Sequence, residues 1–224
     1  MTEPTPVVFA ERDVESIIVA GRSGNIIKDN GRYKNVSIPY RCALIPRDDL
    51  TLREAAIGAV QSLRMATGYQ QLEDTYDPDH FRVARVSAGL NIESIVEQAG
   101  KFTLTFDCKP QRYLKSGQMP LVFEKPSILF NQGEEAKPLI TVYGSGAGTL
   151  TVGSITVQIK EMDDILILDS DLENGYRQIG NGAPESMNGK IYAPKFPVLM
   201  AGKNAIDWSG GVTKVEIIPR WWTL

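Results

Sequence analysis

The 224-residue sequence is poor in the side chains that most enzyme and metal sites require. It has one histidine, His80, and two cysteines. A single histidine excludes a zinc site built from two or three histidines of one chain. The Gly-x-Ser-x-Gly turn that exposes a nucleophilic serine in α/β-hydrolases is also absent. We therefore predict that the protein is not an enzyme, with no catalytic residue, no metal and no cofactor.

The sequence has neither a strong charge of one sign nor a long apolar run. Lys and Arg number 24 against 27 Asp and Glu, which gives a net charge of -3 and no electrostatic basis for binding nucleic acid or an anionic membrane. No apolar run approaches the ~20 residues that a membrane-spanning helix needs. The first residues also lack the basic start and apolar block of a signal peptide. We expect no nucleic-acid binding, no membrane insertion and synthesis in a bacterial cytoplasm.

The two cysteines, Cys42 and Cys108, lie in segments where apolar and polar residues alternate. In such a strand a thiol on the apolar side behaves as a small hydrophobic group. Disulfides are rare in proteins that stay in a reducing cytosol. The sequence therefore predicts two buried free thiols.

Strand patterns dominate the first half of the chain. Residues 13–20 are mostly β-branched and end at the turn-forming residues 21–24, while the Asp-Asn-Gly of 29–31 predicts a second hairpin turn. Residues 36–44 and 101–109 alternate with a period of two, which is typical of strands with one buried face. The 36–44 segment contains a proline, which cannot donate to a ladder. It therefore predicts an edge strand or a strand whose donors on that side face away from the sheet.

One helix is predicted with a clear start. Thr51 and Glu54 form a capping box, in which each side chain satisfies a backbone donor at the helix end. The helix is expected to run from Leu52 to about Ala66 and to lie close against a sheet on its alanine-rich face. A second, short helix is predicted over residues 91–98, with an irregular loop as the alternative.

The second half reads as short strands separated by Gly, Asn or Asp, a pattern typical of an antiparallel sandwich. The predicted strands are 128–130, 139–143, 149–152, 155–159, 165–168, 205–208 and 212–218. Gly-rich residues 144–148 lack the Lys-Ser/Thr ending and the following helix of a phosphate-binding loop, so we expect a turn there. An acidic cluster is interpreted as a solvated strand end and not as a calcium loop: Asp163, Asp164, Asp169, Asp171 and Glu173.

The three tryptophans offer an alternative function. Exposed aromatic rings on a sandwich can stack on sugars, so a carbohydrate-binding module that recognises host-surface glycans stays open, with Trp208 as the candidate stacking residue. A tryptophan in an alternating strand is more often part of a core, and a terminal aromatic strand is more often a docking element. We expect the latter for Trp221 and Trp222.

Four sequence motifs carry a resemblance to a known family. They are residues 68–82 (GYQQLEDTYDPDHFR), 100–113 (GKFTLTFDCKPQRY), 143–146 (YGSG) and the final 219–224 (PRWWTL). Together they resemble the distal tail protein (Dit) family of long-tailed, non-contractile bacteriophages and prophages.

The resemblance implies a mainly β, two-domain protein. Residues 1–118 would form a ring-forming, β-sandwich-like N-terminal domain with one helix and a hairpin, and 119–218 a galectin-like antiparallel β-sandwich. The last residues, 219–224, would return to the first domain. The implied function is a structural virion protein, the distal hub ring that joins the tail tube to the tail-tip or baseplate proteins that engage the host.

The same resemblance implies the partners and the location. Copies of the chain would assemble, as a homohexamer, with the tail tube protein on one side and a tail-associated lysin, tail fibre or receptor-binding protein on the other. The protein would reside in the virion tail. Candidate interface residues are taken from hairpins around 31–33 and 76–78 and from nearby arginines, because Tyr and Arg are enriched at interface centres. They are Tyr33, Arg64, Tyr76, Arg82, Arg85 and Arg112.

Overall fold

The computed structural model describes residues 8–46, 50–64, 68–87, 93–96, 99–178, 180 and 182–224. The protein is mainly antiparallel β-structure and divides into two compact units. Unit 1 comprises Met1–Arg112 together with Leu224, and unit 2 comprises Tyr113–Thr223. The mainly β, two-domain fold class is confirmed. The domain boundary at residue 118 and the roles of the two domains stay predictions.

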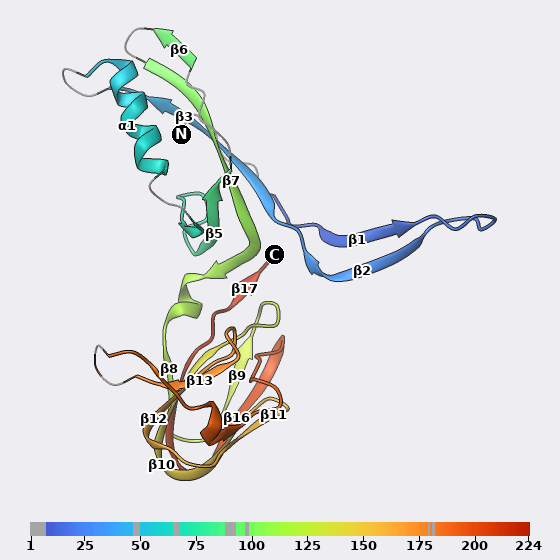
Figure 1. The fold of residues 1–224 in the computed structure, drawn as a ribbon, viewed down its shortest axis with the longest axis vertical. Helices are drawn as coiled ribbons and strands as arrows, with labels where there is room; N and C mark the ends of the chain where they lie inside the picture. The colour runs from blue at the N-terminus through green and yellow to red at the C-terminus, as the bar shows by residue number, and fades with distance from the viewer. Residues whose placement is uncertain are drawn as a thin grey trace. The chain divides into compact units, whose positions relative to one another are not determined.

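Unit 1 is built around one long strand, β7, whose last two residues belong to unit 2. Strands β3, β5 and β6 pair with β7, β4 pairs with β5, and β1 and β2 form a separate two-stranded sheet. Figure 1 shows both parts, coloured from blue to green. The elements are β1 (Arg12–Ile17), β2 (Ile26–Tyr33), β3 (Val36–Leu44), α1 (Leu52–Arg64), β4 (Gln70–Leu72), β5 (His80–Val86), β6 (Glu93–Val96) and β7 (Ala99–Leu114).

The pairing of β3 with β7 holds the small core of unit 1. Their register runs without a break from Val36 opposite Cys108 to Leu44 opposite Gly100, as the alternation of both segments predicts. The core comprises Val36, Ile38, Tyr40, Ala84 and Cys108. Among the described strands β3 has β7 as its single partner, which agrees with the proline within it.

Both cysteines are free thiols, and Cys108 is fully buried while Cys42 is half-buried. Burial raises the pKa of the Cys108 thiol to about 11. Cys108 therefore stays protonated at neutral pH and behaves as an apolar core residue.

Helix α1 begins at its predicted cap. The Thr51 N–H donates to the Glu54 carboxylate at 2.9 Å, and the Glu54 N–H donates to the Thr51 hydroxyl at 3.3 Å. The apolar stripe is half-buried beside β3, and none of the helix side chains that the structure describes is fully buried. The helix therefore covers its sheet more loosely than the alanine-rich stripe predicts.

One turn prediction and one helix prediction in unit 1 are wrong. Asp29-Asn30-Gly31 does not form a hairpin turn but lies inside β2, where Gly31 has a φ of 72° and the pairing with β1 shifts register between Arg12 and Val14. These residues form an irregularity in the ladder, because Asn and Gly suit bulges as well as turns. Glu93–Val96 is a strand that pairs with the start of β7, and not the second helix; 91, 92, 97 and 98 lie outside the described residues.

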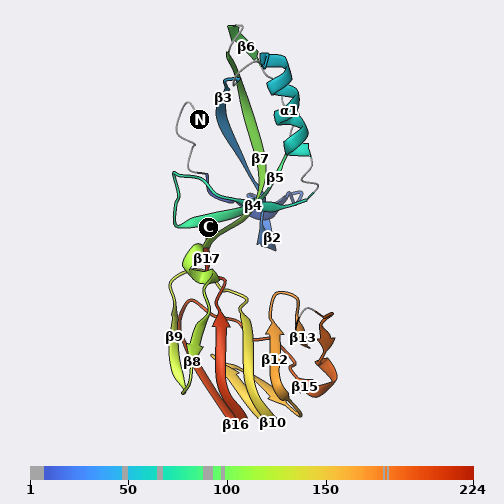
Figure 2. The same ribbon diagram turned by 90° about the vertical axis from the view of Figure 1, so that its left-hand side faces the viewer.

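Unit 2 is an antiparallel sandwich organised by two long strands, β10 and β16, that pair along most of their length (Figure 2). The first half of β10 lies between β16 and β12, and its second half between β16 and β11. The elements are 3₁₀ turns at Lys115–Gln118 and Asn188–Lys190, β8 (Leu121–Phe123), β9 (Ser127–Asn131), β10 (Leu139–Val152), β11 (Ile155–Ile159), β12 (Asp163–Asp169), β13 (Asn174–Arg177), β14 (Glu185–Ser186), β15 (Ile191–Tyr192), β16 (Gly202–Ile218) and β17 (Trp222–Thr223).

Both halves of β10 contribute to one core. Ile140 and Val142 from the first half and Leu150 and Val152 from the second are fully buried in the same cluster. The sheet therefore folds over itself along a line across β10 and β16, and its inner faces meet.

The glycines on that line explain how the strands bend. A Cβ atom on Gly144 would lie 2.0 Å from the Gly211 carbonyl oxygen, and one on Gly211 would lie 1.8 Å from the Ser145 carbonyl oxygen. We call Gly144, Gly148, Gly210 and Gly211 the crease. The Gly-rich segment 144–148 is neither a phosphate loop nor the predicted turn, and the strands predicted on either side of it are halves of one strand.

Candidate functional site

The hairpin of β1 and β2, here called the arm, is the most exposed part of unit 1. Figure 1 shows it extending away from the sheet built on β7. In the part of the chain that the structure describes, its strands pair only with each other. Three ion pairs join the strands: Arg12–Asp29 at 2.9 Å, Lys28–Glu15 at 3.2 Å and Arg32–Asp13 at 2.7 Å.

Apolar side chains lie on both faces of the arm near its outer end. Ile17 is opposite Ile26, and Ser16 is opposite Ile27. Residues opposite each other in an antiparallel pair share a face, and successive residues alternate, so Ile17 and Ile26 lie on one face and Ile27 on the other. Ile27 is 60% exposed, and Ile18 in the connecting turn is 82% exposed. The arm therefore offers apolar surface in two directions.

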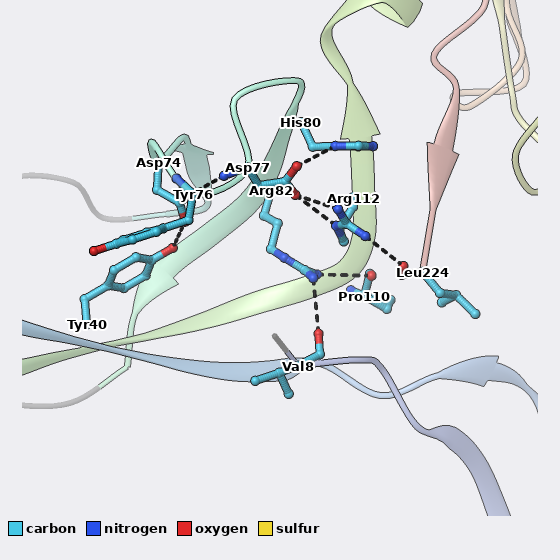
Figure 3. A network of polar contacts seen from close by, with 10 residues as sticks. All are labelled: Val8, Tyr40, Asp74, Tyr76, Asp77, His80, Arg82, Pro110, Arg112 and Leu224. Carbon is cyan, nitrogen blue, oxygen red and sulfur yellow. Dashed lines mark hydrogen bonds and ion pairs between the residues drawn. The ribbon is translucent and has the colours of Figure 1, made fainter. Parts of the chain in front are cut away.

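A pocket of about 180 Å³ lies in unit 1 beside the loop between β4 and β5. Figure 3 shows the polar residues around it. The structure brings three of the predicted interface residues together here: Tyr76, Arg82 and Arg112. Its other polar lining residues are Tyr40, Asp74, Asp77 and His80. Of these, only Asp77 lies in a hairpin predicted to reach a neighbouring copy.

Asp77 is the centre of an ion-pair cluster at this pocket. Its carboxylate accepts from Arg112 Nη2 at 2.7 Å and lies 2.7 Å from His80 Nδ1. Burial raises the pKa of Asp77, but the hydrogen bonds from Arg112 and His80 outweigh it and hold the pKa below its ordinary value. Arg112 also donates to the Leu224 carbonyl oxygen at 3.4 Å. The cluster thus fixes the 77–80 turn to β7.

Asp74 and Tyr40 form the second polar group of the pocket. The Tyr40 hydroxyl donates to Asp74 at 2.6 Å, and the Asp74 carboxylate also accepts from the N–H groups of Tyr76 and Asp77. Burial and the hydrogen bond to Asp74 raise the pKa of Tyr40. Tyr40 therefore remains a neutral donor.

This arrangement is not suited to nucleophilic catalysis. The residues that line the pocket include no Ser, Thr or Cys that His80 could activate. Among the described residues no group of three or more His, Cys, Asp or Glu could hold a metal ion. Likewise, no described helix is long and apolar enough to cross a membrane.

The remaining candidate interface residues lie apart from the pocket. Tyr33 ends β2 under the Arg12 guanidinium, 4.9 Å from its carbon to the ring centre. Arg85 is exposed and donates to Asp107 at 2.9 Å. Arg64 ends α1, and its side chain is outside the described residues. No partner chain is present, so the role of these residues at an interface stays a prediction.

The C-terminal residues make an extensive set of contacts inside unit 2. Trp221 and Trp222 pack against its core, and the Trp222 indole N–H donates to the Glu135 carbonyl oxygen at 2.9 Å. Strand β17 pairs with β7, where the Leu114 N–H donates to the Trp221 carbonyl oxygen at 2.9 Å. Residues 219–223 belong to unit 2 and Leu224 to unit 1, so their predicted docking on the first domain stays a prediction.

Arg220 anchors this segment through a buried ion pair. Its Nη1 and Nη2 donate to the two oxygens of Asp169 at 2.7 and 3.0 Å, and the Asp169 side chain is 7% exposed. Asp169 also accepts from the N–H groups of Asp171 and Leu172. The predicted solvated strand end is therefore wrong for Asp169, whereas Asp163 is exposed and pairs with Arg177.

Acid should weaken unit 2 through this pair. Burial raises the pKa of Asp169, but the hydrogen bonds from Arg220 outweigh it and hold the pKa below its ordinary value. A carboxyl with a lowered folded-state pKa adds stability above its unfolded pKa of ~3.9, and that stability is lost as pH falls through the folded value. Between pH 7 and 2.5, Asp169→Asn should lose less stability than the unchanged protein in urea unfolding followed by tryptophan fluorescence. Equal losses would contradict this role.

Comparison with known proteins identifies the fold. No family model and no curated protein matches the sequence. Among solved structures, the Dit protein of phage SPP1, described as a paradigm of the hub adsorption apparatus in phages that infect Gram-positive bacteria, matches with a TM-score of 0.70 and 12% identity over 97% of this chain and 92% of that chain. The chain shares the fold of the SPP1 Dit protein.

A second similar structure comes from a phage baseplate. A chain of the phage p2 baseplate in its activated conformation matches with a TM-score of 0.50 and 9% identity over 95% of this chain and 88% of that chain. Both matches span nearly the whole chain, so the similarity includes unit 1 with its arm and unit 2.

Proposed function

We propose that the protein is a structural component of a phage tail, a hub ring of identical copies that joins the tail tube to the tail-tip or baseplate proteins. The fold shared with the SPP1 Dit protein supports a tail-hub role. The ring is supported by the arm, because the arm exposes isoleucines on both faces and pairs with no other described strand. The protein would act by assembly and not by catalysis.

The arm makes physical sense as an intersubunit element. An isolated two-stranded hairpin is marginally stable in water. Burying its exposed isoleucine side chains against another surface would lower the free energy. A closed ring needs two different complementary patches on each subunit. An arm with two apolar faces can supply one of them by lying between surfaces of a neighbouring copy.

Unit 2 would provide the attachment point for other tail proteins. Strand β9 pairs only with β16 among the described strands and carries two exposed apolar side chains, Ile128 and Phe130. The proposed partners are the tail tube protein and a tail-associated lysin, tail fibre or receptor-binding protein. Assembly as a hexamer, synthesis in the host cytoplasm and residence in the virion tail belong to the same proposal.

The carbohydrate-binding alternative receives no support from the tryptophans. Trp208 is half-buried and packs against the core of unit 2, as do Trp221 and Trp222. Stacking on a sugar needs an open ring face. We therefore do not propose carbohydrate binding for this protein.

Placing a charge on the arm should block assembly without unfolding the chain. Ile27→Asp puts a carboxylate on an exposed position whose burial we assign to a neighbouring copy, and a buried unpaired charge is strongly unfavourable. Light scattering after gel filtration should give a multiple of the 24.7 kDa chain mass for the unchanged protein and a clear fall toward 24.7 kDa for the variant.

The matched control is Ile128→Asp, which changes an equally exposed isoleucine in unit 2. It should keep the mass of the unchanged protein, and both variants should keep its circular dichroism. A ring that survives Ile27→Asp would contradict the role of the arm while leaving the tail-hub function to be judged by imaging.

A further inference from the structure

Arg82 is a half-buried cation with no hydrogen-bonded carboxylate in the described part of the chain. Its Nη2 donates to the Val8 carbonyl oxygen at 3.3 Å and its Nη1 to the Pro110 carbonyl oxygen at 3.4 Å. Both hydrogen bonds are long, both acceptors are neutral, and no ion pair joins Arg82 to Asp74 or Asp77 (Figure 3). Removal from water lowers the pKa of Arg82. A guanidinium taken out of water without an anion is energetically unfavourable.

The two carboxylates of the same pocket are held by other groups. Asp77 is bound by Arg112 and His80, and Asp74 by the Tyr40 hydroxyl and two backbone N–H groups. Neither forms an ion pair with Arg82. Arg82 therefore lacks a hydrogen-bonded carboxylate among the described residues, although the charge of Asp77 attracts it from nearby.

The pocket has space and walls for a small ligand. Its volume of about 180 Å³ is far above the ~10–15 Å³ that one water molecule needs. Val8, Ile38 and Leu72 line it together with Arg82. Ligand sites commonly combine such apolar walls with a few polar groups that fix orientation.

We propose that this pocket binds a carboxylate group carried on a short aliphatic stem, with the carboxylate on Arg82 and the stem against Val8, Ile38 and Leu72. Arg is well matched to a carboxylate because its planar N–H groups can donate in parallel to both oxygens. A single negative charge suits the site better than a phosphate dianion, because Asp74 and Asp77 repel additional negative charge. The carboxylate can come from an acidic side chain of a second copy or from a free carboxylic acid.

Calorimetric titration of the full-length protein with butyrate tests the proposal at constant ionic strength. We expect saturable binding of one butyrate per chain, with no binding of butyramide, which has the same stem without the charge. Arg82→Gln should weaken butyrate binding at least tenfold, and Arg82→Lys less. Arg53→Gln, which removes an exposed arginine of α1 outside the pocket, should bind as the unchanged protein does.

Absence of saturable butyrate binding, equal binding of butyramide, or tighter binding of inorganic phosphate would overturn the proposal. The comparison of the three small molecules needs no variant, so it stands even if Arg82→Gln does not fold. Light scattering on the same samples separates the two sources. A mass that falls as butyrate saturates assigns the carboxylate to a second copy, and an unchanged mass assigns it to a free acid. Neither outcome depends on whether the assembly is a tail ring.

Discussion

Gly211→Ala should lower the free energy of unfolding of unit 2 by more than ~2 kcal/mol. The added methyl carbon would lie 1.8 Å from the Ser145 carbonyl oxygen, far inside contact distance, and the atom it meets belongs to the backbone and not to a flexible side chain. Overpacking a well-packed site typically costs 1–3 kcal/mol and occasionally more. Here relief requires the two strands of the crease to move apart, which would disturb the core that both halves of β10 share.

Tryptophan fluorescence reports this loss selectively, since Trp208, Trp221 and Trp222 all belong to unit 2. Gly189→Ala is the matched control, because a Cβ there meets no atom within 4 Å. Urea unfolding should show a lower midpoint for Gly211→Ala and little change for Gly189→Ala. A Gly211→Ala protein as stable as the control would show that the crease tolerates side chains.

Arg220→Ala should destabilise unit 2 by about 3 kcal/mol, since removing one partner of a buried ion pair leaves the other charge buried and uncompensated. Asp169 is almost fully buried and receives two hydrogen bonds from Arg220. The loss should also loosen the attachment of Trp221 and Trp222, which follow Arg220 and pack on the same core. The fluorescence emission of the folded variant should therefore shift to longer wavelength.

The control for this variant is Lys190→Ala, which removes an exposed ion pair with Glu161. Exposed pairs contribute ~0–1 kcal/mol, so that variant should unfold close to the unchanged protein. As pH falls through the lowered pKa of Asp169, the difference between Arg220→Ala and the unchanged protein should shrink. A small effect of Arg220→Ala at pH 7 would mean that the aromatic contacts alone hold the C-terminal segment.

Local patterns predicted the parts of the fold that depend on local interactions. The alternation of β3 and β7 and the Thr51–Glu54 capping box are found as expected. Asp29-Asn30-Gly31 predicts a hairpin turn but lies in a strand irregularity, because bulges and hairpin turns use the same residue types. Residues 144–148 predict a turn because glycine is common both in turns and where strands approach closely. Only the approach of Gly144 to Gly211, 67 positions away in the chain, separates the two cases.

The sequence predicts Tyr76, Arg82 and Arg112 at a subunit interface because interfaces favour these side-chain types. The structure places all three at one pocket, and their interface role stays a prediction. The pairing of Asp77 with Arg112 joins positions far apart in the sequence, so no local signal predicts it. Whether Asp74 or Asp77 forms an ion pair with Arg82 likewise depends on where they direct their oxygens, which sequence spacing does not specify.

Electron microscopy of the purified protein tests the central claim most directly. The account predicts closed rings of identical copies, six by the resemblance to the distal tail family, in which the arm of each copy contacts its neighbour. Particles that are uniformly single 24.7 kDa chains at micromolar concentration, with the arm free in solution, would contradict it.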